Sequence, residues 1–254
     1  MRGKKILWGM IFIILLIIFV FCGYKLLSGI SNDGGDVQKY ISTTETPAET
    51  ANAALAENHN IDWDKLQADN SDIYSWIYIP NTNVDYPVVQ SSKYESDTFY
   101  LTHNIQKEDD IAGAIYSERL NSKDYSDPVT LIYGHNMKNG SMFKTLHSFE
   151  DSKFFKKNKY IYIYLPQRKL TYKIYAAYVY DDRHILNSFD FGKKSVLKKY
   201  LKYTQNPDSL TKNTREVDLD VNSRIITLST CTNSSENTRY LVQGVLIKDE
   251  QTNE

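Results

Sequence analysis

Short apolar stretches separated by turn-forming residues repeat along the chain from residue 72 onward. Many of them alternate tyrosine with aliphatic residues, as in Tyr160-Ile-Tyr-Ile-Tyr164, and such alternation is typical of β-strands. The pattern predicts strands at 75–79, 84–90, 112–116, 129–135, 160–165, 170–180, 225–230 and 240–247. About eight short strands with few helices favour a closed, mainly β barrel.

Helical spacing of apolar residues interrupts this pattern at a few points. The clearest helix is expected at 191–203, and a shorter one at 142–149. Another short helix is expected at 62–68, where Asp62 is a suitable N-cap. Residues 48–58 are rich in alanine and glutamate and predict a helix that precedes the barrel.

The N-terminus has a different pattern, in which a basic tail precedes a long apolar run. The tail, residues 1–5, holds an arginine and two lysines, and residues 6–24 carry no charge. About 20 apolar residues are needed to cross a bilayer, so we expect a transmembrane anchor over 6–27. The basic tail predicts a cytoplasmic N-terminus, which makes the chain a single-pass protein of the cell membrane with its folded domain extracellular.

The rest of the chain divides by composition. Residues 28–60 are linker-like, contain Asp33-Gly-Gly35, and form the expected stalk, which is partly helical. The folded domain is expected at 61–250, followed by a short tail at 251–254.

Composition narrows the classes of function. The 254 residues are 41% hydrophobic and 24% charged, as is ordinary for a globular protein. The formal net charge is −1, so neither nucleic acid nor an acidic surface is implied as a partner. Cys22 lies in the expected anchor, so no disulfide to Cys231 is expected. No residues have metal-ligand spacing, so we expect neither a metal nor another cofactor.

Cys231 stands where the strand 225–230 ends, and Arg239 stands where the next strand begins. Neighbouring strands would bring the two side chains together, and a thiol beside a fixed cation favours a reactive thiolate. The alternative is an inert core residue, which is the more common role of a lone cysteine in an apolar strand. An unpaired cysteine outside the cell is unusual, and it indicates a reactive thiol or an intermolecular pair.

His135 ends the strand 129–135 between Gly134 and Asn136, a setting that suits an acid/base group. The alternative is an ordinary histidine in a surface loop. None of the remaining histidines has a comparable setting: His59, His103, His147 and His184. A thiol, an imidazole and a guanidinium together supply a nucleophile, a proton carrier and support for an oxyanion, which are the parts of cysteine acyl transfer.

At these positions the sequence resembles the sortases, the membrane-anchored cysteine transpeptidases of Gram-positive bacteria. Thr227-Leu-Ser-Thr-Cys231 is similar to the TLxTC signature of that family. Tyr133-Gly-His135-Asn and Arg239 match the family's histidine and arginine positions. The run Pro80-Asn-Thr-Asn-Val-Asp-Tyr-Pro-Val-Val-Gln90 resembles class B members, and the similarity covers about residues 60–248.

The resemblance implies an eight-stranded sortase barrel and a cysteine transpeptidase. Such an enzyme cleaves a C-terminal sorting motif after threonine, holds the acyl group as a thioester on Cys231, and transfers it to an amino group. It implies that His135 is the general acid/base and that Arg239 holds the oxyanion or the substrate backbone. Ser229 and Thr230 lie on the strand of the cysteine and are expected to contact substrate, with a purely structural role for either one as the alternative.

The partners implied are sorting-signal peptides and the amine of a peptidoglycan precursor or cross-bridge, a reaction that anchors surface proteins to the cell wall. The acidic cluster with which some class A members bind calcium is not identifiable, so no metal is expected.

Two alternatives stay open. A pilin-polymerising sortase would use the same chemistry, but the lid motif of class C pilus enzymes is not found before residue 72, which favours wall anchoring. A degenerate ectodomain would only bind sorting peptides or cell wall, and the presence of all three catalytic residue types argues against it.

Overall fold

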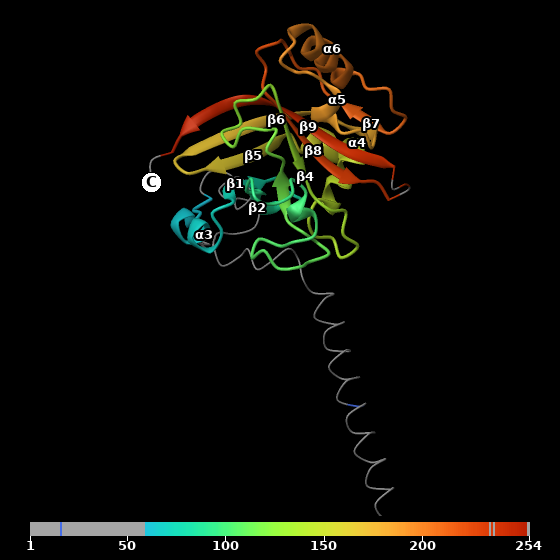
Figure 1. The fold of residues 1–254 in the computed structure, drawn as a ribbon. Coiled ribbons are helices and arrows are strands. Elements are labelled where there is room, and N and C mark those ends of the chain that lie inside the picture. The colour runs from blue at the N-terminus through green and yellow to red at the C-terminus, as the bar shows by residue number, and fades with distance from the viewer. Residues whose placement is uncertain (1–15, 17–58, 234, 236, 253–254) are drawn as a thin grey trace, which may run out of the picture. The chain divides into compact units, whose positions relative to one another are not determined.

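The computed structural model describes residue 16, residues 59–233, residue 235 and residues 237–252 (Figure 1). The chain divides into two units, 1–33 and 34–254, and every strand described belongs to the second. The expected anchor, Leu16 apart, and the expected stalk up to residue 58 lie outside the described residues. Within the described part of the chain, no helix has the length and apolar character needed to cross a membrane.

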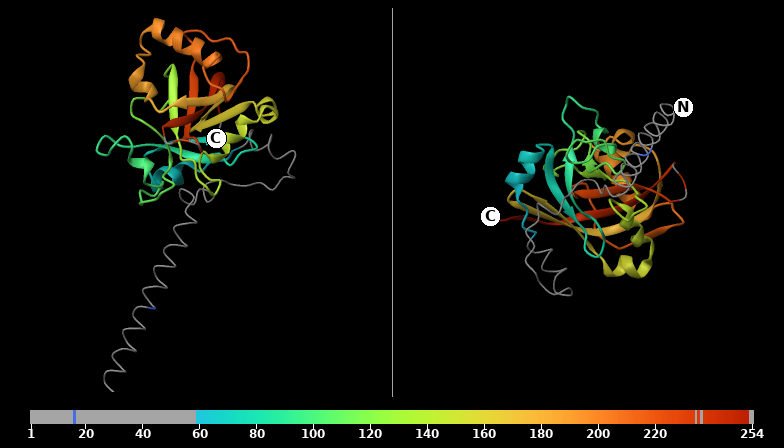
Figure 2. Two further views of the ribbon diagram at one scale, coloured as in Figure 1. Left: turned by 90° about the vertical axis from the view of Figure 1, so that its right-hand side faces the viewer. Right: turned by 90° about the horizontal axis from the view of Figure 1, so that it is seen from below.

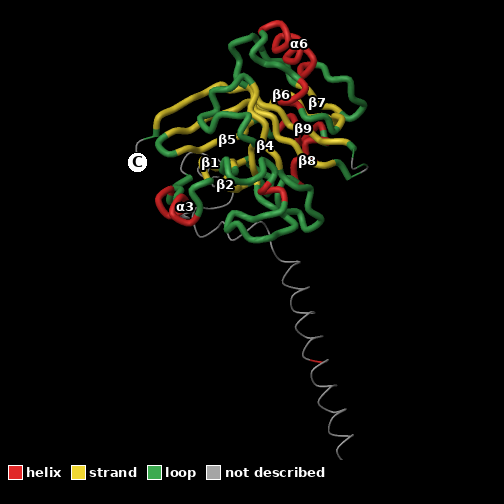
Figure 3. The backbone as a smooth tube through the Cα atoms, viewed as in Figure 1, coloured by secondary structure: helices red, strands yellow, loops and turns green. Residues whose placement is uncertain are grey.

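Nine strands are found among the described residues: β1 (Ile73–Tyr78), β2 (Asp85–Gln90), β3 (Ile115–Ser117), β4 (Val129–Tyr133), β5 (Tyr160–Leu165), β6 (Arg168–Asp181), β7 (Lys212–Thr214), β8 (Ile225–Cys231) and β9 (Thr238–Gln251). They form one sheet in the order β5-β1-β2-β3-β4-β8-β9-β6-β7, and β5 also pairs with β6. That pairing closes eight strands into a barrel and leaves the short β7 as an addition to β6 (Figure 3). The predicted eight-stranded, mainly β barrel is thus confirmed.

The strand boundaries differ from the predicted ones where turns were hard to place. β3 begins later than the predicted 112–116, and β9 begins at Thr238, so Arg239 lies inside the strand. β6 and β9 each have 14 residues and pair along nearly their whole length. This long ladder forms one side of the barrel, and its Thr238 end leads into the loop after Cys231.

The described helices are short: α3 (Trp63–Asp69), α4 (Ser152–Lys157), α5 (Ile185–Ser188), α6 (Lys194–Gln205) and the 3-10 helices η2 (Phe99–Leu101) and η3 (Lys144–Glu150). The expected helices at 191–203, 142–149 and 62–68 correspond to α6, η3 and α3. Asp62 caps α3 as expected, because its carboxylate accepts the Lys65 N–H at 3.0 Å. α6 lies at the opposite end of the domain from α3 (Figure 2).

Apolar side chains form a core on each face of the sheet. Alternation along β8 turns Ile226 and Leu228 into the barrel interior, where Trp76 is also buried. The opposite face carries Ile225 and packs against residues of α6 such as Leu197. Because both faces are covered, β4, β8 and β9 are rigid supports for side chains at their ends.

Candidate active site

Three neighbouring strands bring the predicted catalytic residues together. β4 and β8 run parallel with Tyr133 beside Ser229, so His135 and Cys231, each two residues further on, leave the sheet at the same edge. β9 runs antiparallel to β8 and places Arg239 opposite Cys231. The strand of the cysteine, β8, therefore lies between β4, which leads to His135, and β9, which carries Arg239.

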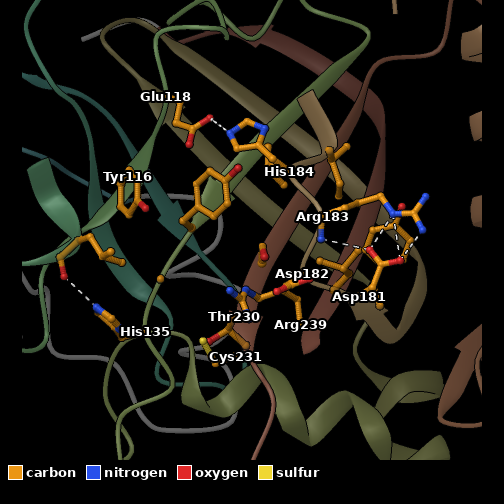
Figure 4. A pocket seen from close by; sticks show the side chains of 18 residues that line it. Tyr116, Glu118, His135, Asp181, Asp182, Arg183, His184, Thr230, Cys231 and Arg239 are labelled. Atoms are coloured by element: carbon orange, nitrogen blue, oxygen red, sulfur yellow. Dashed lines mark hydrogen bonds and ion pairs between the residues drawn. The ribbon is translucent and has the colours of Figure 1, made fainter. Parts of the chain in front are cut away.

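A pocket opens at this edge, on the outer face of the barrel (Figure 4). Its volume is about 220 Å³, and it is lined by His135, Cys231, Arg239, Ser229 and Thr230 together with Leu101, Tyr116, Glu118, Tyr133 and residues 180–185. All five site residues predicted from the sequence thus border one cavity. The segment 180–185 comes from the end of β6 and the start of α5, and it forms a wall of the pocket.

Cys231 is a free cysteine and is partly exposed at the end of its strand. Its main-chain carbonyl accepts two side-chain hydrogen bonds, from Asn136 Nδ2 at 2.9 Å and from His147 Nε2 at 3.0 Å. The carbonyl of the peptide unit that follows the thiol is therefore held from outside the β8–β9 ladder.

The His135 ring is held by the main chain of η2. Nε2 lies 2.8 Å from the Leu101 carbonyl oxygen, on the side of the ring turned away from Cys231 (Figure 4). A carbonyl only accepts, so Nε2 carries a hydrogen and Nδ1 is the basic atom of the neutral ring. The Leu101 carbonyl thus fixes the tautomer of the imidazole.

The Arg239 guanidinium lies at the pocket and donates from Nη1 to the Thr238 carbonyl at 3.1 Å. Two stacked tyrosines, Tyr116 and Tyr133, face the same space with ring centroids 5.2 Å apart. Burial, and then Glu118, raises the pKa of both phenols, while the charge of Arg239 opposes that rise. Both tyrosines are consequently neutral hydroxyl donors at ordinary pH.

Glu118 and His184 form an ion pair in the pocket wall, with His184 Nε2 2.6 Å from Glu118 Oε2. The Glu118 side chain is 7% exposed, and burial raises its pKa while the histidine beside it opposes the shift. The pair ties the wall at residues 180–185 to the end of β3. Sequence reasoning missed both residues, because they are distant in sequence and belong to no motif.

Ser229 and Thr230 differ in their surroundings. Ser229 is on the same face of β8 as Cys231, whereas strand alternation turns Thr230 toward the barrel interior. Thr230 is 2% exposed, and its hydroxyl has no hydrogen-bond partner among the residues that the structure describes. Of the two residues, Ser229 therefore has the side chain that faces the pocket more directly.

Comparisons with known proteins agree with this arrangement. A sequence model of the sortase domain matches residues 77–247. The chain is 28% identical over 254 residues to sortase B of Listeria monocytogenes, covering 97% of this chain and 99% of that relative. Sortase B of Clostridium perfringens superimposes with a TM-score of 0.66 at 34% identity, over 74% of this chain and 100% of that structure.

A class B sortase of Streptococcus pyogenes that is involved in pilus biogenesis superimposes with a TM-score of 0.63 at 27% identity. The match covers 75% of this chain and 100% of that structure. The sequence match over most of the chain, the closed barrel and these neighbours lead to one conclusion: the chain belongs to the sortase family and is a class B sortase transpeptidase.

Proposed function

We propose that this sortase cleaves a C-terminal sorting motif after its threonine and joins the threonine to an amino group of peptidoglycan, which anchors surface proteins to the cell wall. The observation that carries the proposal is the placement of Cys231 between His135 and Arg239 at the mouth of one pocket.

In the first half-reaction, the Cys231 thiolate forms a bond to the threonine carbonyl carbon. The C–N bond of the next residue then breaks, and the His135 imidazolium gives its proton to the leaving amine. Arg239 stabilises the oxyanion, or holds the substrate backbone, because its guanidinium stays charged throughout. The product is a thioester on Cys231.

In the second half-reaction, the amine of the acceptor attacks the thioester carbon and the C–S bond breaks. His135 takes the proton from the attacking nitrogen, which restores the thiolate and the imidazolium. One amide is exchanged for another, so the cycle needs neither an oxidant nor an energy source. Ser229 is the proposed substrate contact on β8, and Thr230, which is 2% exposed, is proposed to have a structural role.

The proposed location is the cell membrane, with the tail 1–5 in the cytoplasm, the anchor at 6–27 and the stalk at 28–60. The support is the uncharged run at 6–24 behind a basic tail. The domain 61–250 then meets both the sorting peptides and the peptidoglycan amine outside the cell.

The second candidate is pilin polymerisation, in which a lysine of a pilin subunit is the acceptor. The Streptococcus pyogenes relative favours it, because that class B sortase is involved in pilus biogenesis. A missing class C lid motif therefore does not separate wall anchoring from pilus assembly in this class. A degenerate binding protein is less well supported, since the nucleophile, the proton carrier and the cation all border one pocket.

The test is to incubate the full chain with a library of sorting peptides, adding peptidoglycan-type amines in one arm and a lysine side-chain amine in the other. Mass spectrometry should find products in which the threonine carbonyl is joined to the peptidoglycan-type amine. Joining only to the lysine amine would favour pilin polymerisation. Peptide binding without cleavage in either arm would contradict both transpeptidase candidates.

A further inference from the structure

The Cys231 carbonyl is held by side chains, whereas the N–H of the same peptide unit, that of Thr232, is held by strand pairing. Thr232 N–H donates to the Thr238 carbonyl at 3.3 Å, so Cys231 and Arg239 face each other as a pair that exchanges no hydrogen bonds. The Cys231 carbonyl consequently points away from β9, toward β4. β4 has already ended there, and side chains of Asn136 and His147 take its place.

His147 must be a hydrogen-bond donor to that carbonyl. Its Nδ1 lies 2.6 Å from Glu150 Oε1, and its Nε2 lies 3.0 Å from the Cys231 oxygen. Both bonds can form with an imidazolium beside a carboxylate, or with a neutral ring beside a protonated Glu150. In either arrangement Nε2 carries a hydrogen and donates it to Cys231.

The ring has little freedom to leave this position. Its side chain is 10% exposed, and it stacks on Tyr240 with centroids 4.9 Å apart. Tyr240 follows Arg239 on β9, so the histidine is packed against the strand that pairs with Cys231. Glu150 comes from the same 3-10 helix, η3, three residues further on.

Asn136 extends the same network to the loop beyond the cysteine. Its Nδ2 also donates to Asn233 Oδ1 at 3.0 Å, and Lys144 Nζ donates to the same oxygen at 2.8 Å. Asn136 adjoins His135 in sequence, so these bonds link the acid/base loop to the main chain of Cys231 and to the side chain of Asn233.

We propose that His147, oriented by Glu150, is a positioning residue that aims the Cys231 thiol by fixing the peptide plane that follows it. The inference rests on the proposed role of Cys231 as the nucleophile. His147 does not line the described pocket and its Nε2 contacts the Cys231 carbonyl, so its proposed effect runs through Cys231. Its loss should lower kcat and leave KM for the sorting peptide nearly unchanged.

The test compares two substitutions at one position in the full chain. His147→Leu removes the donor and should lower kcat about tenfold, the effect of one lost hydrogen bond that misplaces a reacting group. His147→Gln keeps an N–H that can reach the Cys231 carbonyl and should restore kcat to within about threefold of wild type. Peptide KM should change by less than about twofold in both variants.

His59→Gln is the matched control. His59 is another imidazole beside a carboxylate, with Nε2 2.9 Å from Asp85 Oδ1, and it stacks on Tyr164 with centroids 5.0 Å apart. It borders no part of the described pocket, so this variant should keep wild-type kcat per folded molecule. A fall in kcat equal to that of His147→Leu would show that general destabilisation explains both, and would overturn the inference.

The rate at which iodoacetamide alkylates Cys231 measures the reactivity of the thiol without a sorting peptide. Mass spectrometry follows it on the proteolytic fragment that contains Cys231. Alkylation should be slowed by His147→Leu and restored by His147→Gln. If wild type turns over no peptide but this alkylation pattern holds, the proposed function fails and the role of His147 stands. Wild-type kcat and alkylation in His147→Leu, or an equal loss in His147→Gln, would overturn the inference.

Discussion

The two ends of β8 differ in how their charged groups are placed: at one end they pair with one another, and at the other they border a pocket. At the Arg224 end, Asp249 is held by Arg168 through two hydrogen bonds of 2.7 Å and by Arg224 at 2.9 Å. The bond from Arg168, aided by Arg224, lowers the pKa of Asp249 to about 2. Charges at this end are satisfied within the protein.

At the Cys231 end, polar groups border a cavity. The main chain of the cysteine is fixed by Asn136 and His147, while the thiol, His135 and Arg239 all line the pocket. The carboxylate there, Glu118, has a raised pKa because burial outweighs its histidine partner. The ion pairs at the Arg224 end thus stabilise the fold, whereas the polar groups at the Cys231 end line the pocket where a substrate would bind.

The largest effect on turnover is expected at the Cys231 end of β8, from Cys231→Ala. Losing a nucleophile typically costs on the order of 10⁶-fold in turnover, so no product should be detectable. The thermal midpoint should stay within a few degrees of wild type, because a partly exposed side chain is removed. Peptide cleavage by this variant at the wild-type rate would assign the nucleophile elsewhere.

Substitutions of Arg239 and His135 should differ in how much they slow acylation and amine-dependent release. Arg239→Ala should lower turnover roughly 10²–10³-fold, the usual loss for an oxyanion donor, and Arg239→Lys should remain poor because lysine lacks the planar fork. His135→Ala should be worse in both acylation and amine-dependent release, since it moves a proton in each. Thioester formation and product release are measured separately. A normal acylation rate in His135→Ala would contradict its acid role.

Asp249→Asn should act on stability alone. The folded pKa lies below the unfolded value of 3.8, so the carboxylate stabilises the fold above pH 4, and this contribution is lost as pH falls from about 4 to 2. After allowance for its 31% exposed side chain, the loss at pH 7 is about 1–2 kcal/mol in the free energy of unfolding.

Denaturant unfolding at pH 7 and pH 3 checks this, with Glu250→Gln as the control. Glu250 is on the same strand but has one exposed lysine partner, Lys248, so its replacement should matter much less. Turnover per folded molecule should be normal in both variants. A stability loss in Asp249→Asn that is the same at both pH values would exclude the ion-pair explanation.

The smallest effect is expected from removing residues 1–58. The barrel and all the residues that line the pocket lie within the described part from residue 59 onward, and no catalytic candidate precedes it. Turnover of soluble peptides should stay within about twofold of the full chain, as for a dispensable linker. A shortened chain that folds but is inactive would show that the stalk shapes the site.

The barrel and five of the residues that line its pocket could be predicted from the sequence. Alternating tyrosines and aliphatics mark strands wherever one face is buried. Cys231 ends β8, whereas His135 lies two residues beyond the end of β4 and Arg239 is the second residue of β9. Helices α4 and α5 were not predicted, because elements of 6 and 4 residues are too short to show a helical period.

Contacts made across the fold could not be predicted in this way. A role for His147 cannot be predicted from the sequence, because the Cys231 carbonyl that it contacts is 84 residues away. Its partner Glu150 stands three residues further on, at helical spacing, and this pair is the local feature of the sequence that could have pointed to His147. Glu118 and His184 offered no comparable signal, since their meeting depends on where α5 packs.

The central place of β9, between β8 and β6, has a consequence for folding kinetics. Asn136 and the carbonyl that it binds are separated by 95 residues, and Tyr178 and Gln243, which join β6 to β9, by 65. Barrels rich in such non-local contacts fold slowly, in milliseconds to seconds. β9, which carries Arg239, follows β8 and Cys231 in the chain and so leaves the ribosome after them. A nascent or truncated chain that ends before residue 238 therefore carries Cys231 without its cation and without a closed barrel.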